Sequence, residues 1–240
     1  MCPKYMTEED LELLNNTATR IPICLCIDTS GSMATKDDDG ISRIDRVKAG
    51  LQDFFRSVEE DDVLVDSAEI CILGYSTDPY LVKPFATLSE GINENINLIP
   101  NGKGDMGKGV LKALELLEER KQKYKNTGRD YFQPCLVILS DGHSTGDGEW
   151  AKLLTDAQKK TLAMEKDKKL TIISVYMGED WESDQKAQKQ LYGFATKNPP
   201  RPVKCSELPK YFQFFTKSIS NSIGNGTGDY EFDFGDWEDF

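Results

Sequence analysis

The sequence lacks several features that would place it in common functional classes. It has one histidine, His143, and no second close cysteine pair beside Cys24 and Cys26, which argues against a zinc site. No apolar stretch approaches the roughly 18 to 20 residues that a transmembrane helix needs. The formal net charge of −12 disfavours a nucleic-acid partner, because phosphates would be repelled, and suits binding to cations or basic protein surfaces.

The ends of the chain differ in character from its middle. The first twenty residues lack the basic start and apolar centre of a secretion signal, so we expect a cytoplasmic location. We expect an N-terminal arm with one short helix over residues 1–20 and a single domain over 21–223, since no linker divides the chain. Residues 224–240 form an acidic, aromatic tail, whose alternating pattern favours an interaction segment that adds to a sheet edge.

Apolar runs alternate with helical periodicity along the middle of the chain. This order predicts an α/β fold with a doubly wound, mostly parallel central sheet and helices on both faces. Pro84 favours an edge position for one short strand, which we expect to be antiparallel. The expected strands are 21–27, 69–75, 80–85, 135–139, 170–176 and 203–204, and the expected helices are 42–58, one starting near 107, 150–166, 184–196 and 207–222.

The most informative segment ends an apolar strand with three oxygen donors. Asp28, Ser30 and Ser32 stand at alternate positions just after that strand. In parallel sheets, ligands bind beyond the carboxyl ends of the strands. One carboxylate and two hydroxyls, without sulfur or imidazole, suit a hard divalent cation. We therefore expect a site for Mg²⁺ in the first place, with Mn²⁺ and Ca²⁺ as alternatives.

A second apolar strand ends in the same way, at Asp141 and Gly142. In a parallel sheet this end lies on the same rim as Asp28. Two carboxylates that meet there would repel unless a cation lay between them or one took up a proton. Asp141 alone could be a plain turn residue, since Asp-Gly is a common loop dipeptide. Beside the first motif, we interpret it as a metal ligand.

These motifs resemble the metal-ion-dependent adhesion site of von Willebrand factor type A (VWA) domains. Asp28, Ser30 and Ser32 match the Asp-x-Ser-x-Ser element, and Asp141 matches the Thr/Ser-Asp-Gly element. The resemblance covers about residues 21–222. It implies a Rossmann-like fold and a metal with one open position, which an acidic side chain of a partner protein fills. It therefore implies metal-dependent protein binding and no catalysis.

The order of elements also resembles a bacterial intracellular branch, the TerY-like proteins associated with tellurium resistance. That resemblance implies a scaffold in tellurium resistance or stress signalling, with kinase-like and phosphatase partners.

One departure from the family pattern concerns the threonine ligand. The matching loop holds Gly104 at that position, and Asp105 is a possible substitute ligand. The residues next to the expected ligands are candidates to contact the partner: Thr29, Gly104, Gly142 and His143.

Other interpretations compete with this one. A P-loop is disfavoured because Gly109, not Ser or Thr, follows Lys108. A metal-dependent phosphohydrolase would want a second aspartate where this chain has Ser30. A structural module with an impaired metal site is the third alternative, because Asp and Ser at strand ends often cap backbone amides.

Overall fold

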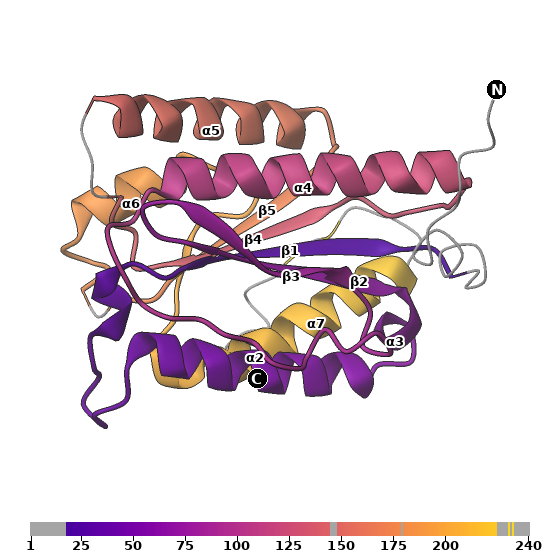
Figure 1. The fold of residues 1–240 in the computed structure, drawn as a ribbon, viewed down its shortest axis with the longest axis horizontal. Coiled ribbons are helices and arrows are strands. Elements are labelled where there is room, and N and C mark those ends of the chain that lie inside the picture. Colours follow the sequence, from indigo (N-terminus) through magenta and orange to yellow (C-terminus); the bar gives the residue numbers. More distant parts are fainter. Residues whose placement is uncertain (1–17, 145–147, 179, 225–229, 231, 233–240) are drawn as a thin grey trace.

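The computed structural model describes residues 18–144, 148–178, 180–224, 230 and 232. Most of the predicted N-terminal arm and of the predicted tail therefore lies outside the described residues. The described chain forms a central sheet with helices on both faces (Figure 1). This confirms the predicted α/β fold class. Among the described residues, no helix is both long enough and apolar enough to cross a lipid bilayer.

The sheet has six strands in the order β3-β2-β1-β4-β5-β6. Five are parallel, and β3 is the antiparallel edge strand. Only residues 76–78 separate β2 from β3, too few for the crossover that a parallel pair needs. The strands are β1 (Ile21–Asp28), β2 (Ala68–Tyr75), β3 (Pro79–Ala86), β4 (Cys135–Ser140), β5 (Thr171–Tyr176) and β6 (Arg201–Pro202).

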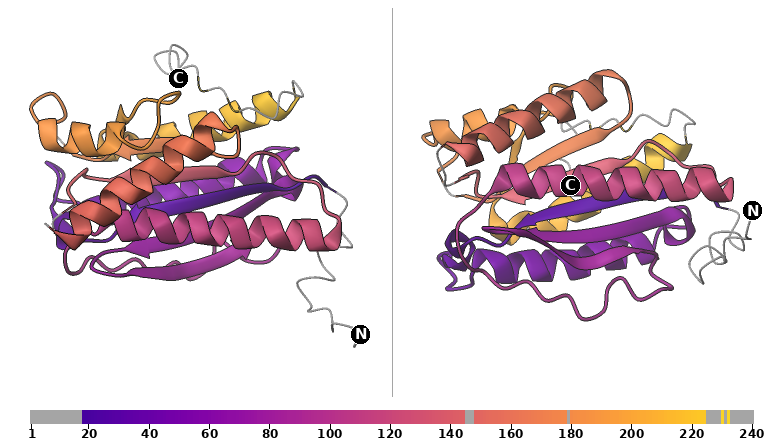
Figure 2. Two further views of the ribbon diagram at one scale, coloured as in Figure 1. Left: turned by 90° about the horizontal axis from the view of Figure 1, so that it is seen from above. Right: turned by 45° about the horizontal axis from the view of Figure 1, so that its top comes forward.

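Helices cover both faces of the sheet (Figures 1 and 2). On one face lie α2 (Arg43–Glu59), α3 (Leu64–Ser67) and α7 (Leu208–Gly224). On the other lie α4 (Met106–Thr127), α5 (Glu149–Lys166) and α6 (Gln185–Tyr192). Two short 3-10 helices, η1 (Gly31–Ala34) and η2 (Cys205–Glu207), lie in the connections.

Two predicted elements differ from the structure. The helix predicted to reach residue 196 ends at Tyr192, because the backbone amides of Thr196 and Lys197 donate to the buried carboxylate of Glu165. The short strand predicted at 203–204 lies at Arg201–Pro202 instead, where it pairs with the end of β5. In both places a tertiary contact outweighs the local pattern.

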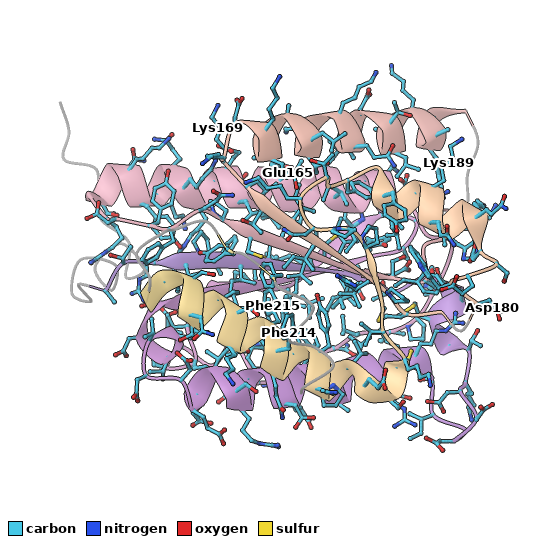
Figure 3. The ribbon with its side chains drawn as sticks, turned by 180° about the vertical axis from the view of Figure 1, so that it is seen from behind. Glu165, Lys169, Asp180, Lys189, Phe214 and Phe215 are labelled. Carbon is cyan, nitrogen blue, oxygen red and sulfur yellow. The ribbon has the colours of Figure 1, made fainter. Side chains whose placement is uncertain are left out.

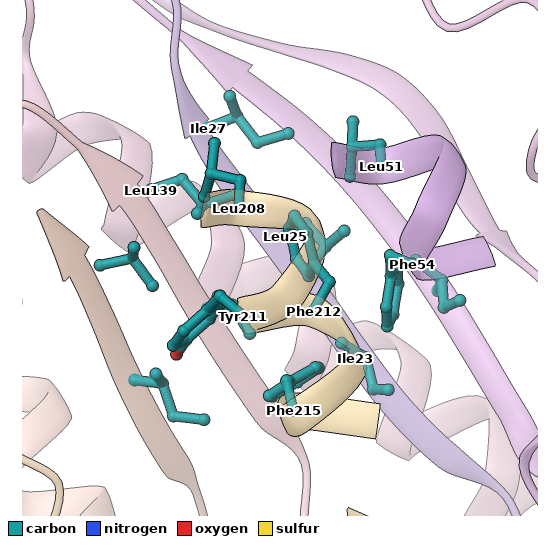
Figure 4. Packing of buried hydrophobic residues seen from close by; sticks show 14 of the residues in the cluster. Ile23, Leu25, Ile27, Leu51, Phe54, Leu139, Leu208, Tyr211, Phe212 and Phe215 are labelled. Atoms are coloured by element: carbon teal, nitrogen blue, oxygen red, sulfur yellow. The ribbon is translucent and has the colours of Figure 1, made fainter. Parts of the chain in front are cut away.

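The central strand β1 is buried on both faces, as its unbroken apolar run indicates. Ile23 and Leu25 face α2 and α7, while Cys24 faces the layer of α4. Aromatic side chains join α2 to α7, with the ring centroids of Phe54 and Phe212 5.2 Å apart (Figure 4). Cys24, Cys26, Cys71 and Cys135 are buried free thiols, and Cys205 is also buried.

A buried ion network ties α4 to the end of the sheet where β2 begins. Glu69 is 1% exposed, and its carboxylate lies 3.1 Å from Arg20 Nε and 2.6 Å from Arg120 Nε. Tyr124 also donates a hydrogen bond to this carboxylate. One buried carboxylate thus pairs with two buried cations.

Candidate metal centre

The candidate site lies where the chain connections diverge on the two sides of the sheet. β1 and β4 are neighbours in register, with Ile27 opposite Leu139. β1 leads through α2 to β2 on one side, and β4 leads through α5 to β5 on the other. Such a switch point opens a crevice beyond the carboxyl ends of the strands. It places Asp28 and Asp141 on one rim.

Asp28 is fully buried and held by hydrogen bonds on both oxygens. Oδ1 accepts from Ser30 N at 2.8 Å, and Oδ2 accepts from the hydroxyls of Ser140 at 2.8 Å and Tyr75 at 3.2 Å. Burial, and next the negative charge of Asp141, raise the pKa of Asp28 to about 6, although the hydrogen bonds from Ser30 and Ser140 oppose this rise. An ionised Asp28 therefore gains from a nearby cation.

The two serines lie together beside this carboxylate. Ser30 Oγ is 3.0 Å from Ser32 Oγ. Ser30 directly precedes η1, and this tight turn places two alternate residues on one side. Gly31 N donates to the carbonyl of Gly102 at 3.0 Å, which anchors the turn to the loop before α4.

Asp141 is almost fully buried and contacts a positive charge. Its Oδ1 accepts from His143 N at 3.2 Å, and its Oδ2 lies 3.4 Å from a guanidinium nitrogen of Arg43. The turn requires Gly142, whose φ is +79° and where a Cβ would lie 2.4 Å from the Cβ of Ala187. A metal ion at this site would therefore share Asp141 with Arg43.

The loop before α4 borders the serines at Gly104. A Cβ at this position would lie 3.1 Å from the backbone carbonyl of His143 and 3.6 Å from Ser30 Oγ, so the loop packs closely here and a side chain would be crowded. The carboxylate of Asp105 caps α4 instead, because Oδ1 accepts from Lys108 N at 3.0 Å. Its Oδ2 accepts no hydrogen bond from the described residues and lies 3.9 Å from Lys108 Nζ. Its role as a ligand stays a prediction.

Three of the four residues predicted to contact a partner are buried. Thr29 donates its hydroxyl to the carbonyl of Tyr75 at 3.0 Å, and both Gly104 and Gly142 are covered. These three residues shape the loops, and their contact with a partner stays a prediction. The side chain of His143 is 39% exposed, with Nε2 3.2 Å from Asp184 Oδ2, so it remains available on the rim.

Sequence reasoning missed three residues that act on the carboxylates. Tyr75 and Ser140 position Asp28, and Arg43 pairs with Asp141. Ser140 stands next to Asp141 in the sequence, which is a weak signal. Tyr75 and Arg43 carry no local signal, since their roles depend on strand order and on the start of α2.

The chemistry of the donors can be compared with the predicted ion. Among the described residues, no three His, Cys, Asp or Glu side chains lie close enough to share a metal. The candidate centre therefore depends on two carboxylates, Asp28 and Asp141, together with the hydroxyls of Ser30 and Ser32. All four are oxygen donors, a set that fits Mg²⁺ better than a softer metal.

The fold and the position of this site define an α/β protein with a polar centre at the switch point of its sheet. The family profile of the von Willebrand factor type A domain matches residues 23–143, which include Asp28 and Asp141. The chain belongs to this family, whose members commonly serve as protein-interaction modules. No curated protein sequence matches the chain.

Solved structures of other proteins share the fold at low sequence identity. The PilB minor pilin from Streptococcus sanguinis has a TM-score of 0.65 at 14% identity, over 88% of this chain and 64% of the pilin. A von Willebrand factor type A protein from Catenulispora acidiphila has a TM-score of 0.61 at 15% identity, over 85% of this chain and 43% of that protein. The SpRpn10 VWA domain has a TM-score of 0.54 at 16% identity, over 80% of this chain and 94% of that domain. The chain thus spans less than two thirds of the first two proteins.

Proposed function

We propose that this VWA domain binds a partner protein through a divalent cation, Mg²⁺ in the first place, at the rim formed by β1 and β4. The observation that carries the proposal is the burial of two carboxylates, Asp28 and Asp141, beside the paired hydroxyls of Ser30 and Ser32. Burial and the negative charge of Asp141 make the ionised form of Asp28 unfavourable without a cation.

The four side chains would hold the ion directly or through water. Bound there, the cation would act as an electrophile for a foreign oxygen ligand. With Asp28 and Asp141 as protein anions, it would still gain from a further carboxylate. An aspartate or glutamate of the partner supplies that ligand.

The proposal extends to a scaffold in tellurium resistance or stress signalling, with kinase-like and phosphatase partners. Its support is the order of elements along the chain, which resembles the TerY-like branch. Growth of a deletion strain in tellurite, complemented by the native gene or by Asp28→Asn, tests this extension. Equal protection by both genes would contradict a metal-dependent role there.

Isothermal titration of the native chain with Mg²⁺ and with Mn²⁺ tests the metal centre itself. We expect saturable heat from the native chain and none from Asp28→Asn. Asp38→Asn is the matched control, because it removes an exposed acid from the nearby loop. Equal heats from the native chain and Asp28→Asn would eliminate the metal centre.

Partner chemistry is tested with a display library of short peptides, selected in Mg²⁺ and released with EDTA. We expect the selected peptides to share one Asp or Glu, whose exchange for Asn or Gln removes binding. Peptides that bind equally well in EDTA would contradict the proposed mode of recognition.

A further inference from the structure

Two aromatic residues from beyond α7 pack into the core. Tyr230 is 4% exposed and Phe232 is 9% exposed. The ring of Phe232 stacks on that of Phe215 in α7, with centroids 5.7 Å apart and planes 5° apart. Figure 3 shows α7 in front of the sheet, with Phe214 and Phe215 along it. Tyr230 and Phe232 belong to the hydrophobic cluster on the face of the sheet that α2 and α7 cover.

The surface that they cover, here called the aromatic seat, includes Cys135, Tyr211 and Phe215. The thiol of Cys135 lies close enough to both Tyr211 and Tyr230 to raise their pKa values, in addition to the larger effect of burial. Cys135 begins β4, six positions before Asp141, or about 20 Å along the strand. The aromatic seat is therefore remote from the candidate metal centre.

The aromatic seat packs well against the aromatic rings of Tyr230 and Phe232 but, within the described part of the chain, offers no hydrogen bond to the hydroxyl of Tyr230. Tyr230 OH has no hydrogen-bond partner among the described residues, although its atom is buried. A buried hydroxyl without a partner opposes docking, whereas a phenylalanine at the same place would avoid that cost. The native occupant is thus weaker than the best one that the seat could hold.

One positively charged side chain lies near the seat. Arg201 in β6 lies close enough to Tyr211 to oppose the rise of its pKa. In the sequence, Tyr230 and Phe232 alternate with the acids Asp229, Glu231 and Asp233. An extended segment with aromatic residues at alternate positions and acids between them complements both the seat and its border.

We propose that the aromatic seat is a docking site for a short aromatic–acidic–aromatic segment of a partner protein, and that the chain's own Tyr230 and Phe232 occupy it in the absence of that partner. Five residues, 225–229, separate α7 from Tyr230, so this occupant competes at the high effective concentration of a short tether. A second copy of the chain offers the same imperfect occupant without the tether and cannot compete at micromolar concentration. A partner segment with phenylalanine at both positions can, because it has no buried hydroxyl. This proposal does not depend on the metal centre.

Fluorescence anisotropy with a labelled synthetic peptide tests the proposal. The probe is the sequence of residues 227–236 with the exchange Tyr230→Phe, and the control peptide has serine at positions 230 and 232. Two variants of the full chain change the native occupant in opposite directions. Phe232→Ala loosens it and is expected to tighten peptide binding about tenfold or more. Tyr230→Phe improves it and is expected to weaken peptide binding about tenfold.

The opposite signs separate a docking site from an ordinary piece of core. If the peptide binds neither the native chain nor Phe232→Ala, the proposal is overturned. If Phe232→Ala does not fold, the comparison of the native chain with Tyr230→Phe decides alone, and equal affinities overturn it. Binding that EDTA removes would place the peptide at the metal centre and overturn it too. Sedimentation that shows a dimer at micromolar concentration would assign the seat to a second copy instead of a partner.

Discussion

Replacement of Asp28 by asparagine should stabilise the metal-free protein while it removes metal binding. The pKa of Asp28 rises from 3.8 to about 6 in the fold. At about 1.4 kcal/mol for each pKa unit, the ionised side chain costs the folded state about 3 kcal/mol. Asparagine has no charge to bury, and its amide oxygen can still accept from Ser30 N. Its amide nitrogen cannot accept from the hydroxyls of Ser140 and Tyr75, so the net gain in the free energy of unfolding lies below about 3 kcal/mol.

The pH dependence of this gain has a defined sign. Because the folded state holds the proton more tightly, the free energy of unfolding falls as the pH rises from about 4 to about 6, and the full cost remains above pH 6. Asp28→Asn should thus match the native chain at pH 4 and exceed it at pH 8. For a domain of this size, each kcal/mol raises Tm by about 2–4 °C.

Thermal melting in EDTA at pH 4 and pH 8, followed by circular dichroism, measures both effects. Asp38→Asn, in the exposed loop, is the control and should leave Tm unchanged at either pH. Added Mg²⁺ should raise the Tm of the native chain and not that of Asp28→Asn. A lower Tm for Asp28→Asn at pH 8, or a gain of equal size at pH 4, would refute the electrostatic reasoning.

Three further substitutions, with Gly224→Ala as a control, separate the site from the scaffold. Ser30→Ala should weaken Mg²⁺ binding, measured by calorimetry, about tenfold or more. Its free energy of unfolding in EDTA should change by only about 1 kcal/mol or less, because the hydroxyl of Ser30 lies on a loop at the rim. A collapsed Tm would show that the loop is part of the scaffold. Glu69→Gln should cost about 3–5 kcal/mol in urea unfolding, because it breaks the buried ion pairs of Glu69 with Arg20 and Arg120. A loss under about 1 kcal/mol would contradict this. Gly107→Ala should cost about 1–3 kcal/mol or more, since its Cβ would lie 2.4 Å from a backbone nitrogen of α5, whereas Gly224→Ala meets no atom within 4 Å and should be neutral.

The long apolar strands could be predicted from the sequence because their signal is local. The segments expected at 21–27 and 135–139 correspond to β1 and β4 within one residue. Pro84 correctly indicated the edge strand β3. The helix expected to reach residue 196 was predicted too long. Glu165, 31 positions away in the sequence, accepts a hydrogen bond from the backbone amide of Thr196. A contact at that separation leaves no trace in a local pattern.

The candidate site was predictable in part for the same reason. Asp28 and Asp141 each follow an apolar strand, and parallel strands end on one rim, so the order of residues is enough to predict that they meet. The side chains that donate hydrogen bonds to these acids or pair with their charge could not be predicted in this way. Tyr75 reaches Asp28 only because β2 lies beside β1, and Arg43 reaches Asp141 only because α2 starts at this rim.

By itself, then, the sequence determined the alternation of strands and helices, the order of buried runs and the spacing of the oxygen donors, since each depends on near neighbours along the chain. Only the tertiary structure decided that Gly104 borders the serines, that Thr29 is covered and that Tyr230 and Phe232 lie in the core. These outcomes depend on segments far apart in the chain, as with Ser140 and Asp28, which are 112 positions apart and joined by one hydrogen bond. Packing brings such groups together, and their burial sets the charge balance of the site.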